Sequence, residues 1–244
     1  MKHLSLAVDL KLREEQAGFR RGRGCIDHIF TLRNVIEQCT EYQLSLYVNF
    51  VDFAKAFDSV HRDSLWRVLP AYGIPFDLTK IIRSFYRNFT CSVGDGDILF
   101  EVKTDVRQGC VMSTVTTVLF NLVVDWVMRR TTEDQNRGIR WTYFSYLEDP
   151  DYADDLALLL HAHSHIQEKT RRLNIFAKQV DLNISSTKTE IMELNTTNRS
   201  PVQVENGALP YTDRFTYLGS IISSEGGQTW TFRAVSIRPE TLLI

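Results

Sequence analysis

Two adjacent carboxylates, Asp154 and Asp155, are the residues of this chain most suited to chemistry. They lie between an aromatic residue, Tyr152, and the unbroken apolar run Leu156–Leu160. A short apolar run bounded by turn-forming residues is typical of a buried strand. Two charges at the end of such a strand are costly unless a cation meets them, and hard carboxylate oxygens suit magnesium. The alternative is an acidic hairpin turn that faces water, since Asp is common in turns.

A third carboxylate, Asp52, ends another β-rich run that starts at Leu46. If the two strands are neighbours, their acidic ends converge on one point. Three carboxylates at one point would repel one another and raise each other's pKa unless cations are bound. Two-metal phosphoryl transfer requires such a cluster, in which two cations roughly 3.5–4 Å apart assist the attacking and the leaving oxygen atoms.

The elements that must position these carboxylates mix helices and strands without strict alternation. An α+β fold with a largely antiparallel sheet is therefore the better prediction than a parallel sheet. Asp77 and Ser164 are predicted N-caps of two helices. Apolar spacing predicts helices over about 25–40, 59–69, 78–88, 113–130 and 165–179. Strands are predicted around 46–52, 141–146, 156–160, 180–184, 190–194 and 215–222, with a hairpin at 91–93 and 98–102.

Composition and charge exclude several classes of protein. With 244 residues, 43% of them hydrophobic and 24% charged, the chain is expected to fold as one large or two small globular domains. No secretory signal or membrane-spanning run is present, which predicts an intracellular location, nuclear or cytoplasmic, and no membrane partner. Its four cysteines form no C-x-x-C pair, which argues against a zinc ribbon. The net charge of -2 gives no global positive field, so a nucleic acid would have to meet local patches.

Two further groups of residues each allow two interpretations. His161, His163 and His165 alternate, so on a strand they would share one face and could bind zinc. We favour surface histidines at a helix start, because no fourth ligand lies close by in the sequence. The basic segment at residues 20–23 could hold a nucleic-acid backbone, although charge alone favours a solvated loop.

An ordered set of motifs resembles the reverse transcriptases of non-LTR (LINE-like) retrotransposons. The motifs are Asp-Phe-Ala-Lys-Ala-Phe-Asp at 52–58, Arg-Gln-Gly-Cys at 107–110 and Tyr-Ala-Asp-Asp at 152–155. One Asp-Asp pair is a weak signal, but the order and spacing of the set are specific. The resemblance implies a right-hand polymerase, with a ferredoxin-like palm of antiparallel strands and helices, partial fingers and the start of a thumb. It implies a reverse transcriptase domain over 1–222 and a divergent, disordered tail over 223–244.

The resemblance also implies catalytic roles. Asp52, Asp154 and, less directly, Asp155 would hold two Mg²⁺ ions, with Mn²⁺ as an alternative. The reaction would be the RNA-templated transfer of deoxynucleotides from their triphosphates to the 3′-hydroxyl of a DNA primer. Lys188 would lie near the pyrophosphate leaving group and supply charge or a proton, the alternative being a solvated lysine at a strand end.

Substrate contacts follow from the same resemblance. Phe57 would lie under the incoming sugar, where its ring would clash with a 2′-hydroxyl and so select deoxynucleotides. Without the resemblance, Phe57 is better explained as an ordinary core residue. Gln108 and Gly109 match the loop that contacts the incoming nucleotide and the template, where a glycine lets the backbone approach closely.

Nucleic-acid contacts are implied for two short segments. The first segment, which resembles the primer grip at the palm–thumb junction, comprises Tyr217, Leu218 and Gly219. The second segment would contact the template or primer backbone and comprises Arg20, Arg21 and Arg23.

The chain also departs from the family pattern. Val111–Thr114 replaces the usual Pro-Leu-Ser-Pro, Asp181 stands where glycine is usual, and Pro150 lies in the strand that enters the acidic turn, which suggests an edge or a bulge. Relatives usually carry more fingers sequence before Gln16, so the pattern resembles a truncated or decaying copy. A second interpretation is therefore an inactive palm-fold relic of a retrotransposon, with at most weak, salt-sensitive binding of nucleic acid.

Overall fold

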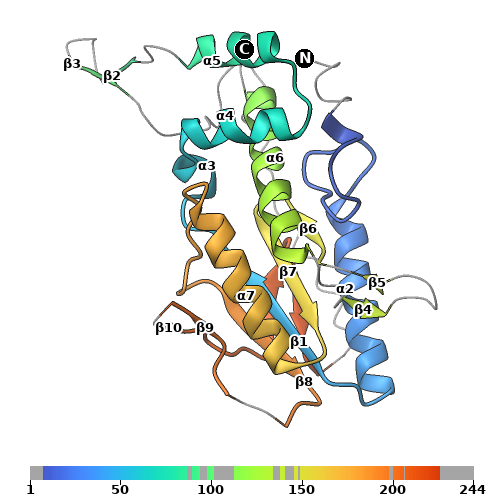
Figure 1. Ribbon diagram of the computed structural model, residues 1–244. Helices are drawn as coiled ribbons and strands as arrows, with labels where there is room; N and C mark the ends of the chain where they lie inside the picture. The colour runs from blue at the N-terminus through green and yellow to red at the C-terminus, as the bar shows by residue number, and fades with distance from the viewer. Residues whose placement is uncertain are drawn as a thin grey trace.

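A four-stranded antiparallel sheet forms the centre of the molecule in the computed structural model (Figure 1). The strand order is β6-β7-β1-β8, so the strand that Asp52 follows lies directly beside the strand that begins at Asp155. The predicted α+β fold with an antiparallel sheet is confirmed. The sheet strands are β6 (Asp151–Tyr152), β7 (Asp155–Leu160), β1 (Leu46–Val51) and β8 (Glu190–Leu194). The structure describes residues 8–86, 90–93, 98–101, 113–133, 138–140, 146–147, 149–197, 200–205 and 207–225.

Helices cover both faces of this sheet. Figure 1 shows α6 and α7 crossing in front of the strands, with α3, α4 and α5 beyond one end of the sheet. The other face is covered by α2 and by a small hairpin of β11 and β12. The helices are α2 (Cys25–Glu41), α3 (Ala56–Ser59), α4 (Arg62–Ala71), α5 (Phe76–Phe85), α6 (Ser113–Thr132) and α7 (His163–Lys178). The strand pairs are β2 (Thr90–Val93) with β3 (Ile98–Glu101), β4 (Ile139–Arg140) with β5 (Tyr146–Leu147), β9 (Gln203–Val204) with β10 (Gly207–Ala208), and β11 (Arg214–Tyr217) with β12 (Ser220–Ser223).

Alternate residues of the central strands enter two separate cores. On β1, Tyr47 and Val51 join the core under α6 and α7, while Val48 and Phe50 join the core under α2. Every residue of β1 is buried as a result. A strand buried on both faces needs apolar residues at successive positions, which explains the unbroken apolar runs in the sequence.

Two buried polar contacts fasten α7 to the sheet. The Asn49 side chain, at the middle of β1, donates a hydrogen bond to the Thr170 hydroxyl at 2.8 Å. Lys169 Nζ lies 2.6 Å from Asp149 Oδ2, and both side chains are almost fully buried. Asp149 also accepts a hydrogen bond from the Leu159 N–H at 3.0 Å. The ion pair therefore fixes the start of the β6–β7 hairpin against α7.

Several helix boundaries differ from the predictions. The helix expected over 59–69 is divided into α3 and α4, and His61 caps α4 by accepting a hydrogen bond from the Asp63 N–H. Pro70 lies inside the last turn of α4 rather than beyond it. Asp77 and Ser164 lie in the first turns of their helices, whose N-caps are Pro75 and Ala162. An acidic residue in the first turn still favours the helix through the macrodipole, so Asp77 is expected to stabilise α5 from a position two residues after the N-cap.

Two predicted strands also differ. The strand expected over 215–222 is a hairpin, because Leu218 and Gly219 both adopt positive φ angles of 49° and 77° and form a tight turn. The strand expected over 180–184 is reduced to an isolated bridge between Phe53 and Ile184. Predicted helices at α2 and α6 and the predicted β2–β3 hairpin are confirmed. The β-like run at 141–145 and the tail beyond 225 lie outside the described residues.

Pro150 precedes β6, which is the edge strand of the sheet, as the sequence predicted. The N-terminal segment contacts the outer side of β6 through a parallel bridge between Gln16 and Asp151.

None of the helices in the described parts of the chain has the length and apolar character needed to span a membrane.

We predict that Lys169→Met lowers the free energy of unfolding by about 3–5 kcal/mol, because it leaves the buried Asp149 carboxylate without its cation. Lys178→Met is the matched control on the same helix, because its ion pair with Glu205 is exposed and screened by solvent and is expected to contribute little to stability. Urea denaturation of both variants measures the difference. Equal losses for the two variants would contradict the structural role given to Lys169.

Candidate active site

The β6–β7 hairpin presents the two adjacent carboxylates at a tight turn. Tyr152 pairs with Asp155, so Ala153 and Asp154 are the two central residues of the turn. Ala153 has a φ of 58°, in the left-handed region that hairpin turns use and that alanine adopts at a cost of roughly 1–2 kcal/mol. Ala153 is also buried, with 4% of its surface exposed. A strained, buried residue at this position indicates that its neighbours hold the turn in place.

The register between β1 and β7 brings Asp52 to the same place. Val51 pairs with Leu156, and one further step along this register places Asp52 opposite Asp155. The odd-numbered residues of β7 lie on the face covered by α2 and the β11–β12 hairpin, since Ala157 and Leu159 belong to that core. The structure therefore gathers the three predicted carboxylates at one end of the sheet.

The electrostatics of the site agree with this arrangement. Burial raises the pKa of Asp155 to about 6, and repulsion from Asp154 and Asp52 adds to the rise. Burial also raises the pKa of Asp154, and the Asp52 charge contributes in the same direction. Each of these two carboxyl groups therefore lies within the electrostatic reach of Asp52. The cluster carries more negative charge than its surroundings neutralise.

Such a cluster fits a hard divalent cation. Among the residues that the structure describes, no group of three or more His, Cys, Asp and Glu side chains forms a ready-made metal cage. Magnesium does not need one, because proteins commonly hold it by one or two carboxylates together with substrate phosphates and water. The mutual repulsion of Asp52, Asp154 and Asp155 is the feature of this site that a cation would relieve.

Lys188 lies beside the first carboxylate. Its Nζ is 3.6 Å from Asp52 Oδ1, and two thirds of its side chain is exposed. The backbone on either side is fixed to Asp52, because the Ser185 N–H donates to the Asp52 carbonyl at 2.9 Å and the Asp52 N–H donates to the Thr189 hydroxyl at 3.2 Å. Lys188 is thus an exposed cation at the edge of the carboxylate cluster, on a loop whose backbone is bonded to Asp52.

Phe57 is half-buried and held between two other rings. It stacks on Phe120 of α6 with ring centroids 4.0 Å apart, and Phe19 meets it edge-on at 6.2 Å. Phe19 follows Gly18, whose backbone abuts the acidic turn. Phe57 is therefore both part of the core, as one interpretation of the sequence held, and linked through Phe19 to the carboxylate cluster.

The segment that resembles a primer grip forms the β11–β12 hairpin. Tyr217 is buried, and its hydroxyl donates to the carbonyl oxygen atoms of Pro150 at 3.2 Å and Asp155 at 3.5 Å. Burial raises the pKa of this hydroxyl well above its usual value, with Asp151 and Asp155 adding to the rise. Leu218 and Gly219 form the turn itself, which Tyr217 connects to the base of the acidic hairpin.

The three arginines of the basic segment have different environments. Arg20 is nearly buried: its guanidinium donates to Asp9 Oδ1 at 2.6 Å and to the carbonyl oxygen atoms of Arg13 and Gln16 at 2.7 and 2.8 Å. These bonds give Arg20 a structural role in the loop. Arg21 is exposed, and Arg23 is an exposed partner of Glu14 at 3.2 Å. Gln108 and Gly109, the predicted nucleotide-binding residues, lie outside the described residues.

A residue that the sequence analysis did not single out, Gly18, lies against the acidic turn. A Cβ atom added at Gly18 would lie 2.8 Å from the Ala153 Cα and closer still to its nitrogen. Asn121 of α6 donates to the Gly18 carbonyl at 2.6 Å. The glycine itself was the sequence signal for this contact, since a glycine outside a phosphate-binding loop commonly marks a place where two backbone segments approach closely.

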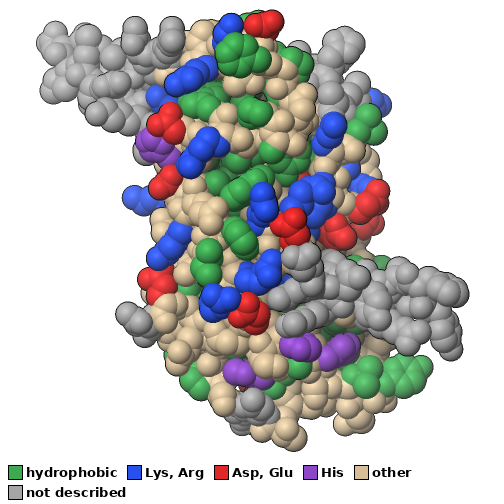
Figure 2. All heavy atoms as spheres, in the orientation of Figure 1, with side chains coloured by type: hydrophobic (Ala, Val, Ile, Leu, Met, Phe, Trp, Pro, Cys, Tyr) green, Lys and Arg blue, Asp and Glu red, His purple; other side chains and the backbone are tan. Residues whose placement is uncertain are grey.

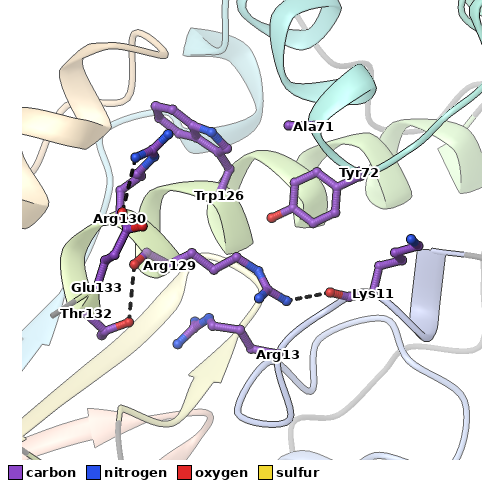
Figure 3. Close-up of a pocket in the computed structure, with 9 residues that line it drawn as sticks. All are labelled: Lys11, Arg13, Ala71, Tyr72, Trp126, Arg129, Arg130, Thr132 and Glu133. Atoms are coloured by element: carbon purple, nitrogen blue, oxygen red, sulfur yellow. Dashed lines mark hydrogen bonds and ion pairs between the residues drawn. The ribbon is translucent and has the colours of Figure 1, made fainter. Parts of the chain in front are cut away.

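A cavity of about 570 Å³ lies away from the acidic turn, between α6, the end of α4 and the N-terminal segment (Figure 3). Three of the basic side chains that line it already have acidic partners. Arg13 pairs with the buried Asp151 and Asp125, Arg129 lies 2.7 Å from Asp125, and Arg130 lies 3.1 Å from Glu133. We therefore assign this cavity to a structural ion network.

The surface over α4, α6 and α7 mixes charges of both signs, and Figure 2 shows basic side chains interspersed with acidic ones there.

Two of the alternating histidines are anchored to backbone carbonyls, His161 to Ser45 at 2.6 Å and His163 to Ser200 at 2.7 Å. No grouping of His, Cys, Asp and Glu in the described ranges supports the zinc interpretation.

Comparison with known proteins gives a consistent result. The sequence profile described as Reverse transcriptase (RNA-dependent DNA polymerase) matches residues 1–222. The chain is 27% identical over 176 residues to the Retrovirus-related Pol polyprotein from type-2 retrotransposable element R2DM of Drosophila melanogaster, covering 71% of this chain and 16% of the relative. It is 26% identical over 232 residues to the corresponding polyprotein from type-1 retrotransposable element R2 of Nasonia vitripennis, covering 86% of this chain and 22% of the relative. The chain thus spans about a fifth of the length of these relatives.

Solved structures of similar fold include telomerases. Apo telomerase from Candida tropicalis, truncated from its C-terminal domain, has a TM-score of 0.63 at 16% identity and covers 91% of this chain and 43% of its own. Telomerase from the same organism in complex with a fragment of telomeric RNA has a TM-score of 0.61 at 14% identity and covers 91% of this chain and 35% of its own. These similarities establish the fold of the palm.

We predict that Gly18→Ala disrupts the acidic turn, because the added methyl group would overlap backbone atoms of Ala153 that cannot move aside. The expected loss is about 2–3 kcal/mol of unfolding free energy. Gly24→Ala is the matched control, since the nearest atom to a Cβ there is 4.0 Å away. Denaturation curves that overlay for the two variants would show that Gly18 does not support the turn.

We predict that Asp155→Asn stabilises the fold at pH 7.5 in the absence of divalent cations. The folded-state pKa of about 6 exceeds the ordinary value of 3.8, so folding disfavours the charged form. The stability contributed by the protonated form is present below about pH 4 and is lost as the pH rises through 6. The pKa shift corresponds to roughly 3 kcal/mol of unfolding free energy. Because the Asp155 side chain is only partly desolvated and also meets solvent at the turn, screening reduces this to an expected gain on the order of 1 kcal/mol.

Thermal unfolding at pH 4 and pH 7.5 checks this prediction, with an increase of roughly 2–4 °C expected at the higher pH only. Asp213→Asn, at an exposed carboxylate outside the site, is the control. A gain that is equal at both pH values would show that charge repulsion at Asp155 is not its cause.

Proposed function

Because the chain belongs to the reverse transcriptase (RNA-dependent DNA polymerase) family, we propose that the β6–β7 turn and the end of β1 form the catalytic centre of an RNA-directed DNA polymerase. The observation that carries the proposal is the β1–β7 register, which places Asp52 opposite Asp155. The raised pKa values of Asp154 and Asp155 support it, because they indicate carboxylates that repel one another in the absence of a cation.

The reaction joins the 3′-oxygen of a primer to the α-phosphorus of a deoxynucleoside triphosphate and breaks the bond to pyrophosphate. Asp52 and Asp154 would hold two Mg²⁺ ions, and Asp155 would add negative charge from the adjacent position. When bound, these ions lower the pKa of the attacking hydroxyl and neutralise charge on the phosphates. The protein's contribution is placement and electrostatics, since no covalent enzyme intermediate is needed.

Lys188 would assist the leaving group. Its ammonium lies at the rim of the cluster, paired with Asp52 at 3.6 Å and largely exposed to solvent. A long, exposed side chain can move from Asp52 toward an incoming polyphosphate, where it would donate a proton or neutralise charge. The fixed loop between Ser185 and Thr189 keeps it within reach.

Phe57 would select deoxynucleotides by steric exclusion. Its stacking on Phe120 and its edge contact with Phe19 leave the ring little freedom to move away from a 2′-hydroxyl. A rigid ring excludes an extra hydroxyl more strongly than a mobile one. Gln108 and Gly109 are proposed to complete the nucleotide site on the basis of the family motif.

The RNA template and DNA primer would be bound by local contacts, because the net charge of the chain is -2. Arg21 and Arg23 are exposed and are the proposed backbone contacts. Arg20 is left out of this proposal because its guanidinium is occupied within the loop. The Leu218–Gly219 turn is proposed to guide the primer end, with Tyr217 fixing it to the acidic hairpin.

A second candidate is a palm-fold domain that binds nucleic acid weakly and has no turnover. The replacement of Pro-Leu-Ser-Pro by Val111–Thr114 favours it, since loss of those prolines loosens the predicted nucleotide loop. This candidate predicts binding that weakens steeply with salt and is not accompanied by synthesis.

Primer extension on an RNA template separates the two candidates. We predict magnesium-dependent incorporation of deoxynucleotides by the wild-type chain and a loss of roughly 100-fold or more in Asp154→Asn, because that variant removes a proposed cation ligand. Asp213→Asn, which changes an exposed carboxylate elsewhere, is expected to extend primers at the wild-type rate. Extension that is equal in the wild type and Asp154→Asn would reject the catalytic proposal.

A further inference from the structure

Gln16 is a fully buried polar side chain at the acidic turn. Its Oε1 accepts hydrogen bonds from the backbone N–H groups of Ala153 at 2.9 Å and Gly18 at 2.8 Å. Its Nε2 donates to the Ala153 carbonyl at 3.4 Å. The side-chain amide therefore engages both backbone polar groups of the strained residue in the turn.

The backbone around Gln16 continues the sheet beyond its edge. The Ala17 N–H donates to the Asp151 carbonyl at 2.8 Å, and the Asp151 N–H donates to the Glu15 carbonyl at 3.1 Å. Past this point the β6 chain turns away, and the next rung is made by the Gln16 side chain instead of by backbone. A glutamine amide carries the same donor and acceptor as a peptide group, so it can replace that missing rung.

These contacts act on the peptide groups on either side of Ala153. The φ of 58° at Ala153 is unfavourable for alanine, so the turn needs external bonds to keep it. The Ala153 carbonyl belongs to the peptide group that contains the Asp154 nitrogen. A rotation of that peptide group would redirect the Asp154 side chain.

We propose that Gln16 is a positioning residue that locks the Ala153 backbone and thereby aims Asp154 at the cation site. This role rests on the proposed polymerase function, because that function is what requires Asp154 to be oriented toward a cation. Gln16 itself lies behind the turn and acts through Ala153, 137 residues away in the chain. Gly18 makes the approach possible, because any side chain there would push the segment off the turn.

Three variants of the full chain test the lock. Gln16→Met keeps the side-chain length and removes both polar groups, and Gln16→Asn keeps the amide but is one methylene too short to reach Ala153. The control is Gln167→Met on α7, because Gln167 makes the same pair of bonds to the backbone of another residue, Gln203, at 2.9 and 2.8 Å. That site lies on β9 and serves no proposed catalytic group.

The first measurement is amide hydrogen exchange in the absence of metal. We expect exchange of the Ala153 and Asp154 amides to accelerate roughly tenfold or more in both Gln16 variants, because a buried donor loses its acceptor. Amides of β8 should exchange at the wild-type rate. Gln167→Met should leave the turn unchanged. A turn that stays as protected in the Gln16 variants as in the Gln167 control overturns the proposal.

The second measurement is Mn²⁺ binding by calorimetry, with Mn²⁺ as the probe. Loss of a residue that orients metal ligands typically weakens affinity 10–100-fold, so we expect a loss of roughly tenfold in Gln16→Met and Gln16→Asn. If Gln16→Met does not fold, the Asn variant decides alone. Wild-type affinity in that variant overturns the proposal.

The two proposals fail in different ways. If the wild-type chain binds Mn²⁺ and the Gln16 variants bind it equally well, Gln16 has no positioning role and the polymerase proposal is untouched. If the wild-type chain neither binds Mn²⁺ nor extends primers, the polymerase proposal fails, and the role of Gln16 in aiming Asp154 fails with it. A drop in the kcat of extension with little change in KM for the nucleotide would match misaligned carboxylates.

Discussion

The pairing register between β1 and β7 is the constraint on which the candidate site depends. It sets Asp52 opposite Asp155 and, at the same time, sends alternate side chains of both strands into two separate cores. A slip of one residue would exchange the two faces along the whole strand and would move Asp52 away from its partner. The same apolar contacts that stabilise the sheet therefore also fix the relative positions of the carboxylates.

Two buried carboxylates anchor the acidic hairpin through ion pairs, whereas the carboxylates at its turn have no such partner among the described contacts. Asp149 and Asp151 are buried, and each has a cation, Lys169 from α7 and Arg13 from the N-terminal segment. The carboxylates at the turn have only Lys188 nearby among the contacts described, and it pairs with Asp52. Pairing the first two anchors the hairpin, while leaving the turn negative creates the electrostatic need for a cation. Unpaired negative charge at the turn lowers the stability of the free protein.

The comparisons and the site agree on a polymerase palm. Telomerase structures share the fold at 16% and 14% identity, and the family profile covers residues 1–222. Similarity at that level establishes architecture alone, so the proposed reaction depends on the geometry of the three carboxylates. The N-terminal segment is part of that geometry, because it extends the sheet at its edge and supports the turn with the Gln16 amide.

The amino-acid sequence was enough to predict the central strands, most helices and the residues of the acidic motif. Its apolar runs are unbroken because both faces of the sheet are covered, and that pattern is local. It also predicted that Asp52 would meet Asp154 and Asp155 if their strands were neighbours. The folded structure was needed to show that these strands are neighbours and that 214–223 is a hairpin. It also showed that Arg20 is bound within its loop and that Gln16 supports the turn. These features depend on contacts between distant segments, and neither periodicity nor propensity at one position carries information about a partner 137 residues away.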